Sequence, residues 1–315
     1  MPEDTPNIPQ DAVPSNLADF ARRFPGMGRH CELLGLHGSA AAALVAQLLS
    51  AADAPLCILA PDHLTAERFF EDLAFHAGNR EGIFFFPHWG INPYEPLNPH
   101  LELETTRIVS LAALLDEKAR AVVLPARALM QRVIPKSILT QLCFTLRCGD
   151  EFPRSRLLTL LVKLGYNPTP LVEERGTFSV RGDILDLFPP TTANPVRIDF
   201  FGDEVERIRL FDPATQRTVS EETAQLEILP VREMILTDEN LEVFSRKLKK
   251  RCDELGLPRP LRESILADIR EGLLFPGCSA LLPLNYDRLD SFFDYAGTVR
   301  WVVIDPSVVL HELER

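Results

Sequence analysis

The sequence predicts an α/β protein in which a parallel sheet with covering helices is interrupted by a smaller α+β domain with an antiparallel sheet. Between about residues 30 and 137, short apolar runs alternate with stretches of helical periodicity. From about residue 138 the pattern changes to strand-rich runs joined by turn residues. After about residue 232 helical patterns return, and one apolar run follows them.

These changes of pattern set the expected domain boundaries. An acidic, proline-rich stretch opens the chain and is expected to be a disordered lead-in. The later segments are the first half of the α/β domain, the inserted domain and the second half. The predicted segments are 1–28, 29–137, 138–228 and 229–315.

Four apolar runs predict the strands of the first half. They are "CELLGL", "PLCILAP", "GIFFFP" and "RAVVLPA". Between the last two, residues 101–119 have helical spacing, with acidic residues early and Lys118 late, as the helix dipole favours. A strand, a crossover helix and another strand imply a parallel sheet whose faces are covered.

The inserted domain is predicted from alternation and turn residues. Residues 176–190, 194–212 and 224–231 are strand-rich, and a short helical pattern precedes them. Gly202 and Asp203 lie between two alternating runs and predict a hairpin turn.

The last part predicts two helices, over 240–256 and 261–272, and a strand in "TVRWVVIDP". A single strand needs neighbours, so we expect it to join the parallel sheet of the first half. The chain stops at a predicted helix start, so we interpret the chain as an N-terminal fragment of a longer protein.

The charge and composition of the chain disfavour several classes of function. The net charge is -12 and the pI about 5.1, which disfavours a nucleic-acid scaffold. Residues 141–225 carry 13 Asp/Glu and 10 Arg/Lys, a net of 10 − 13 = −3. The six cysteines contain no C-x-x-C pair, so no metal site is expected. The chain has no signal peptide and no apolar run of membrane-spanning length. We expect a soluble, cytoplasmic protein.

The stretch "LLGLHGSAAAALVAQLLS" has the outline of a phosphate-binding loop that leads into a helix. Gly35 fills the first signature position, and Gly38 and Ser39 follow. Ala40, Ala41 and Ala42 then stand where glycine, lysine and a hydroxyl are required. This is either a nucleotide site that has lost its chemistry or an alanine-rich helix.

Strand alternation assigns two faces to the inserted sheet. In "VRIDFF", one face carries Arg197, Asp199 and Phe201 and is predicted to face solvent. The neighbouring "TFSVRGD" is expected to point Arg181 outward and Val180 inward. An exposed phenylalanine among arginines is typical of an interface hot spot. In the alternative, a loop covers Phe201 and the arginines pair with Glu204 and Glu206.

Several long blocks carry a family resemblance. They are "HWGINPYEPLNPH", "ALMQRVIP", "GTFSVRGDILDLFPP", "VRIDFFGDEVERIRLFDPATQRT" and "WVVIDP". In this order they resemble the N-terminal, UvrB-homologous module of the bacterial transcription-repair coupling factors (Mfd). The resemblance implies a degenerate helicase-like α/β domain in two halves, with a second domain inserted between them.

The same resemblance implies a non-catalytic role in nucleotide excision repair of damaged DNA. The inserted domain is the family's docking surface for the damage sensor UvrA, and its contact residues correspond to Arg181, Arg197 and Phe201. In full-length members this face is held against a C-terminal domain until RNA polymerase is engaged. Polymerase and DNA are expected to be bound only through other domains.

The resemblance also extends to the motor site. "WVVIDP" occupies the place of the second ATPase motif, where Asp305 persists and Pro306 replaces a glutamate. With Ala41 and Ala42 in the loop, we expect a vestigial site without a cofactor. ATP and Mg²⁺ are expected only for the motor domains of the full-length protein.

The alternative is a UvrB-like, nucleotide-dependent helicase domain that verifies damage. The stretch around Trp89 and Tyr94 leaves no room for a long aromatic hairpin. We expect these two rings to pack the loop.

Overall fold

The computed structural model describes residues 31–92, 94–273 and 275–314, so the predicted lead-in lies outside the described residues. The chain forms two compact units. The first contains the described parts of Met1–Phe85, Lys118–Ala126 and Thr298–Arg315, and the second contains Phe86–Glu117 and Arg127–Gly297. This grouping places residues 86–117, 127–137 and 229–297 with the inserted sheet, whereas the sequence boundaries assigned them to the α/β domain.

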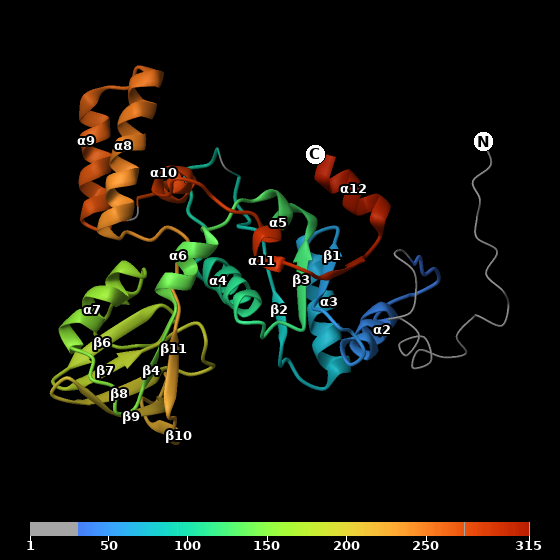
Figure 1. The fold of residues 1–315 in the computed structure, drawn as a ribbon, viewed down its shortest axis with the longest axis horizontal. Helices are drawn as coiled ribbons and strands as arrows, with labels where there is room; N and C mark the ends of the chain where they lie inside the picture. Colours follow the sequence, from blue (N-terminus) through green and yellow to red (C-terminus); the bar gives the residue numbers. More distant parts are fainter. Residues whose placement is uncertain (1–30, 93, 274, 315) are drawn as a thin grey trace. The chain divides into compact units, whose positions relative to one another are not determined.

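The first unit contains the expected parallel sheet (Figure 1). Its strand order is β12-β1-β3-β2, and all pairings are parallel. The four strands are β1 (Leu56–Ala60), β2 (Ile83–Phe85), β3 (Ala121–Pro125) and β12 (Arg300–Val303). The prediction that the last apolar run joins this sheet is confirmed, since Arg300 pairs with Leu56 and Val303 with Leu59.

Within the described residues, this unit contains the helices α2 (Ala40–Leu49), α3 (His63–Ala77) and α12 (Pro306–Glu314). The Asp62 carboxylate accepts a hydrogen bond from the Thr65 backbone N–H at 2.9 Å and starts α3. Gly78 ends the same helix with φ of 79°, a conformation that costs glycine little. Apolar residues of α2 and α3 pack with β1 and β3 in one core.

One predicted strand is wrong. The run "CELLGL", residues 31–36, forms no strand, and its side chains are exposed, Leu34 by 84%. Gly35 has φ of 78°, which interrupts an extended backbone, and Glu32 brings charge into the run. The apolar composition therefore did not specify a buried strand here.

The second unit contains the antiparallel sheet. Its order is β10-β9-β8-β7-β6-β5, antiparallel except where β5 meets β6. The strands are β5 (Asn167–Pro168), β6 (Thr177–Arg181), β7 (Ile184–Leu187), β8 (Val196–Phe201), β9 (Glu204–Phe211) and β10 (Thr218–Glu222). The predicted hairpin turn at Gly202 and Asp203 is confirmed, because Phe201 pairs with Glu204.

A separate two-stranded ladder joins β4 (Phe144–Arg147) to β11 (Gln225–Ile228). The helices of the unit and its flanks are α4 (Leu101–Leu115), α5 (Ala126–Met130), α6 (Lys136–Leu142), α7 (Arg154–Lys163), α8 (Asp238–Leu255), α9 (Arg259–Arg270), α10 (Leu282–Asn285) and α11 (Phe292–Ala296). A 3-10 turn over Cys278–Leu281 precedes α10.

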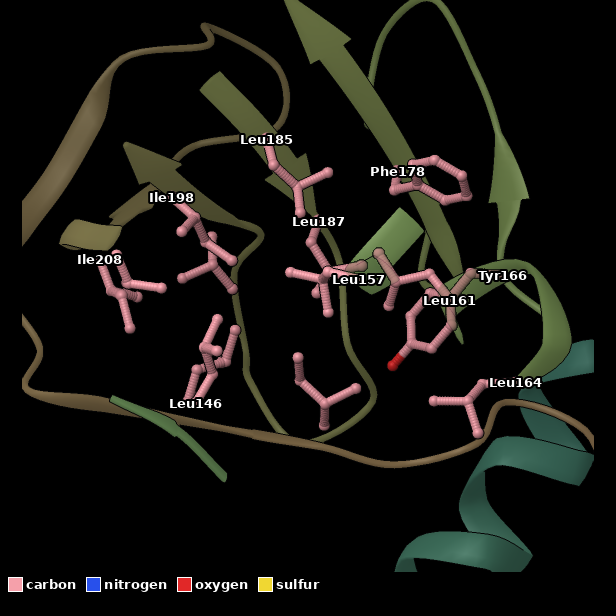
Figure 2. Packing of buried hydrophobic residues seen from close by; sticks show 14 of the residues in the cluster. Leu146, Leu157, Leu161, Leu164, Tyr166, Phe178, Leu185, Leu187, Ile198 and Ile208 are labelled. Atoms are coloured by element: carbon pink, nitrogen blue, oxygen red, sulfur yellow. The ribbon is translucent and has the colours of Figure 1, made fainter. Parts of the chain in front are cut away.

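The inner face of the antiparallel sheet packs against α7 and the β4–β11 ladder (Figure 2). Leu157 and Leu161 of α7 point toward Leu185, Leu187 and other strand side chains, and all of these are buried. Burial of such side chains contributes roughly 1.5–3 kcal/mol each. The Tyr166 hydroxyl lies at the edge of this core and donates to the Leu229 carbonyl at 2.9 Å.

A buried polar cluster organises the rest of this unit. Arg107 of α4 and Glu233 form an ion pair in which neither side chain is exposed. The Arg107 guanidinium also donates to the Pro87 carbonyl at 2.8 Å and lies over the Phe86 ring, 4.4 Å from its centroid. The Trp89 indole N–H donates to Glu233 at 3.0 Å. Trp89 therefore packs its loop, as predicted.

The same prediction is wrong for Tyr94, which is 95% exposed. The Asn92 side chain accepts a hydrogen bond from the Tyr94 backbone N–H at 3.1 Å. Such a local turn suits a surface position.

Among the described residues, no helix is both long and apolar enough to cross a membrane.

Glu104 gives the buried cluster a pH dependence. Its side chain is 2% exposed and lies 3.1 Å from Arg232. Burial raises the pKa of this carboxyl from its ordinary 4.5 to about 7, against the opposing effect of Arg232. The folded protein therefore binds more protons than the unfolded chain between these pH values, so stability falls as pH rises through them.

We expect Glu104→Gln to remove this contribution to the pH dependence of stability. The free energy of unfolding of the variant, minus that of wild type, should increase by at most roughly 3 kcal/mol as the pH rises from 5 to 8. Urea denaturation at both pH values measures the difference. A constant difference across that range would contradict the raised pKa.

Candidate partner-binding face

The predicted faces of β8 are confirmed. Val196, Ile198 and Phe200 are buried, whereas the Phe201 side chain on the opposite face is 77% exposed. The alternative in which a loop covers Phe201 is therefore wrong. A register shift between Asp199 and Phe200 places Glu206 as an extra residue on β9. Such a bulge increases the local twist and turns side chains at a strand end.

Asp186 of β7 organises the outer face, which we define as the outward side chains of β6 to β9. Its carboxylate is 1% exposed and accepts two hydrogen bonds from Arg197, from Nε at 2.7 Å and from Nη2 at 2.9 Å. These bonds raise the pKa of the Arg197 guanidinium, which also lies 4.8 Å from the Phe211 ring centroid. Arg197 is thus held in one orientation, with 19% of its side chain exposed.

Two arginines of β9 have other partners. Arg209 pairs with Asp199, and Arg207 pairs with Glu206 at 2.8 Å. The expected pairing of arginines with nearby glutamates thus holds for Arg207 and fails for Arg197. Arg197 and Arg209 are direct cross-strand neighbours, and each has its own carboxylate partner, Asp186 or Asp199, which balances its charge.

Arg181 lies at the more open end of the outer face. Half of its side chain is exposed, and its guanidinium reaches Asp186 only at 3.9 Å. The Phe200 backbone N–H donates to the Asp183 carbonyl at 2.9 Å, which joins the β6–β7 turn to the end of β8. Arg181 and Phe201 therefore flank neighbouring turns at one end of the sheet.

Val180 lies on the inner side of the sheet, as expected, because it pairs with the buried Leu185, but it is 40% exposed and is not part of the core. Ser179 lies on the outer side, opposite Asp186, and is nevertheless buried, where it donates to the Pro170 carbonyl at 3.1 Å. The two-residue strand β5 pairs with β6 only as far as Phe178. The end of β6 beyond that point lacks a neighbour on one side, and its apolar side chain adds to the exposed surface.

Sequence reasoning missed Asp186 as the residue that holds Arg197. A signal was present, because alternation in "ILDL" places Ile184 and Asp186 on the face opposite Leu185 and Leu187. The register confirms it: Asp186 pairs directly with Arg197. An acidic residue in a buried strand needs a partner, and the neighbouring strand supplies one.

The residues of the predicted vestigial nucleotide site lie in the first unit. Gly35 and Gly38 have positive φ, Ser39 precedes α2 without a side-chain cap, and α2 begins at Ala40. Ala42 is 1% exposed and belongs to the core, and Ala41 packs against it. The first residues of α2 therefore contribute to the core of the first unit.

Asp305 is exposed, with φ of 49°, and its carbonyl accepts from the Val308 and Val309 N–H groups at the start of α12. Within the described residues, no side-chain hydrogen bond or ion pair connects Asp305 with Gly35, Gly38 or Ser39. That this region is a vestigial site without a bound cofactor stays a prediction.

Comparison with known proteins identifies the family. The UvrB interaction domain model matches residues 144–234, which include the whole outer face. The chain is 37% identical to the transcription-repair-coupling factor of Myxococcus xanthus over 276 residues, covering 85% of this chain and 23% of that protein. The chain belongs to the transcription-repair-coupling factor family. The coupling factor of Escherichia coli is 31% identical over 84% of this chain and 22% of that protein.

A relative with a different name also matches. UvrABC system protein B of Kosmotoga olearia is 28% identical over 92% of this chain and 46% of that protein. The chain spans about a quarter of the length of the coupling factors that it matches. The predicted contacts Arg181, Arg197 and Phe201 all lie within the matched interaction domain.

The contacts of Arg197 and Arg181 predict different effects on stability. Arg197→Ala would leave the buried Asp186 carboxylate with only the distant Arg181, and we expect a loss of about 2 kcal/mol in the free energy of unfolding. Arg181→Ala removes an exposed pair and should change it by less than about 0.5 kcal/mol. Urea denaturation of both variants distinguishes them, and equal effects would contradict the assigned contacts.

Proposed function

We propose that this chain is a non-catalytic adaptor that recruits UvrA to stalled RNA polymerase, and that UvrA docks on the outer face of β6 to β9. The observation that carries the proposal is the 77% exposure of Phe201 on the same face as the half-exposed Arg181. Aromatic and arginine side chains supply most hot spots in protein interfaces. The match of the UvrB interaction domain to this sheet supports the same choice of surface.

Each predicted contact has a separate role. Phe201 supplies apolar area that a partner can cover. Arg181 has one 3.9 Å partner, so its guanidinium is available for a bidentate contact with a carboxylate. Arg197 exposes one edge while Asp186 and Phe211 fix the rest of its side chain. It therefore offers a pre-positioned donor beside the two more exposed residues.

The full-length relatives suggest how the outer face is controlled. We propose that in the longer protein a C-terminal domain covers this face until polymerase is engaged, as the family resemblance implies. An exposed aromatic side chain flanked by an arginine would serve both partners in turn. DNA and polymerase contacts would then belong to other domains.

Packing at the start of α2 supports the non-catalytic assignment. The position that requires a Mg²⁺-binding hydroxyl is Ala42, which is 1% exposed in the core. Ala41, at the lysine position, also packs against this core. A UvrB-like helicase is the second candidate, and the 28% identity to UvrABC system protein B favours it. The missing lysine and hydroxyl count against it.

We expect Phe201→Ala to weaken UvrA binding by about tenfold or more, a cost of at least 1.4 kcal/mol that is typical of a central aromatic contact. Titration calorimetry with purified UvrA measures it. Phe75→Ala is the matched control, because Phe75 is also exposed, by 81%, and lies outside the interaction domain. Equal affinities of wild type and Phe201→Ala would refute this surface.

We also expect no ATP turnover by this chain above a buffer blank. Ala41→Lys should not create activity, because Ala42 and Pro306 still lack the metal ligand and the carboxylate that positions water. A phosphate-release assay tests both proteins. Turnover by wild type that disappears in Asp305→Ala would overturn the non-catalytic assignment.

A further inference from the structure

A basic groove lies between α8 and α9, outside the matched interaction domain. The two helices form an antiparallel pair joined at Gly256, whose φ is 63° (Figure 1). A hollow of about 540 Å³ opens along this pair. Its lining residues are Leu241, Glu242, Ser245, Arg246, Lys249, Arg262, Leu266 and Arg270.

The spacing of the lining residues gives the groove its shape. On α8 the positions 241, 245 and 249 are four residues apart, and on α9 the positions 262, 266 and 270 are as well. Each row spans about 12 Å of helix axis at 1.5 Å per residue. Two adjacent rows of this kind form a groove that fits the i±4 ridge of a third helix.

The charge of the groove is strongly one-sided. Four cations and a single carboxylate line it. Arg246 pairs with Asp287 at 2.9 Å and Arg262 with Asp253 at 3.7 Å. Within the described residues, Lys249 and Arg270 have no ion-pair or hydrogen-bond partner, although the whole chain is acidic.

We propose that this groove binds an amphipathic, acidic helix of a partner protein. Apolar side chains of that helix would cover Leu241 and Leu266, and its carboxylates would pair with Lys249 and Arg270. Recognition by a helix in a groove uses this combination of apolar anchors and flanking charges. A nucleic-acid backbone would use the cations but would gain nothing from the two leucines, and the net charge of -12 opposes its approach.

The proposal is tested with the whole chain and a fluorescein-labelled peptide of about 16 residues, with leucine at i, i+4 and i+7 spacing and glutamate beside it. A scrambled peptide of the same composition and a single-stranded oligonucleotide are the other probes. The protein variants are Lys249→Glu with Arg270→Glu, and Leu266→Gln. Lys250→Glu is the matched control, since Lys250 is the next residue on α8 and does not line the groove.

Fluorescence anisotropy should show binding of the patterned peptide and at least fivefold weaker binding of the scrambled one. The double charge reversal should weaken binding by at least about tenfold, Leu266→Gln should weaken it as well, and Lys250→Glu should leave it within about twofold. If Leu266→Gln fails to fold, the double charge reversal and the scrambled peptide decide the matter. Absence of peptide binding to wild type, equal binding of both peptides, or variant-sensitive binding of the oligonucleotide alone would overturn the proposal.

Discussion

The second unit depends on the buried ion pair between Arg107 and Glu233. Two charges without solvent need each other and further hydrogen bonds, and here Pro87, Gln131 and Trp89 provide part of those bonds. Within the described residues, Arg107 Nη2 and Glu233 Oε2 have no hydrogen-bond partner. Glu233 lies at the end of the matched interaction domain, on the segment that follows β11. Its backbone carbonyl accepts from the Tyr286 hydroxyl at 2.7 Å, and the neighbouring Arg232 pairs with Glu104 of α4. The segment after β11 is therefore bonded on several sides, and this cluster anchors the sheet to α4.

The outer face combines fixed and free groups on that anchored sheet. Asp186 and Asp199 hold two arginines close to the strands, which leaves Phe201 and Arg181 as its most exposed predicted contacts. A buried carboxylate beneath an arginine fixes the geometry of the surface without contributing exposed area. This arrangement explains how a chain with a net charge of -12 can present guanidinium groups at a chosen place. The charges are balanced locally, one pair at a time.

Features with a strong local signal could be predicted from the sequence. Period-two alternation placed Phe200 inward and Phe201 outward, and Gly202 with Asp203 set the hairpin register. A single apolar strand needs neighbouring strands, and this requirement predicted that the last strand joins the parallel sheet. The failures involve context that a sequence does not display. Residues 31–36 are apolar yet exposed, and Val180 lies where β5 ends too early to cover it. The partner of Arg197 required knowledge of which strand lies beside β8.

The fixed orientation of Arg197 has a thermodynamic consequence. A long side chain ordinarily loses rotamer freedom when a partner immobilises it, at about 0.5–1.5 kcal/mol. Here the bonds to Asp186 and the stacking over Phe211 impose that loss during folding. Any molecule that covers this arginine therefore meets a preorganised donor, and the entropic penalty of ordering it has already been absorbed by the fold.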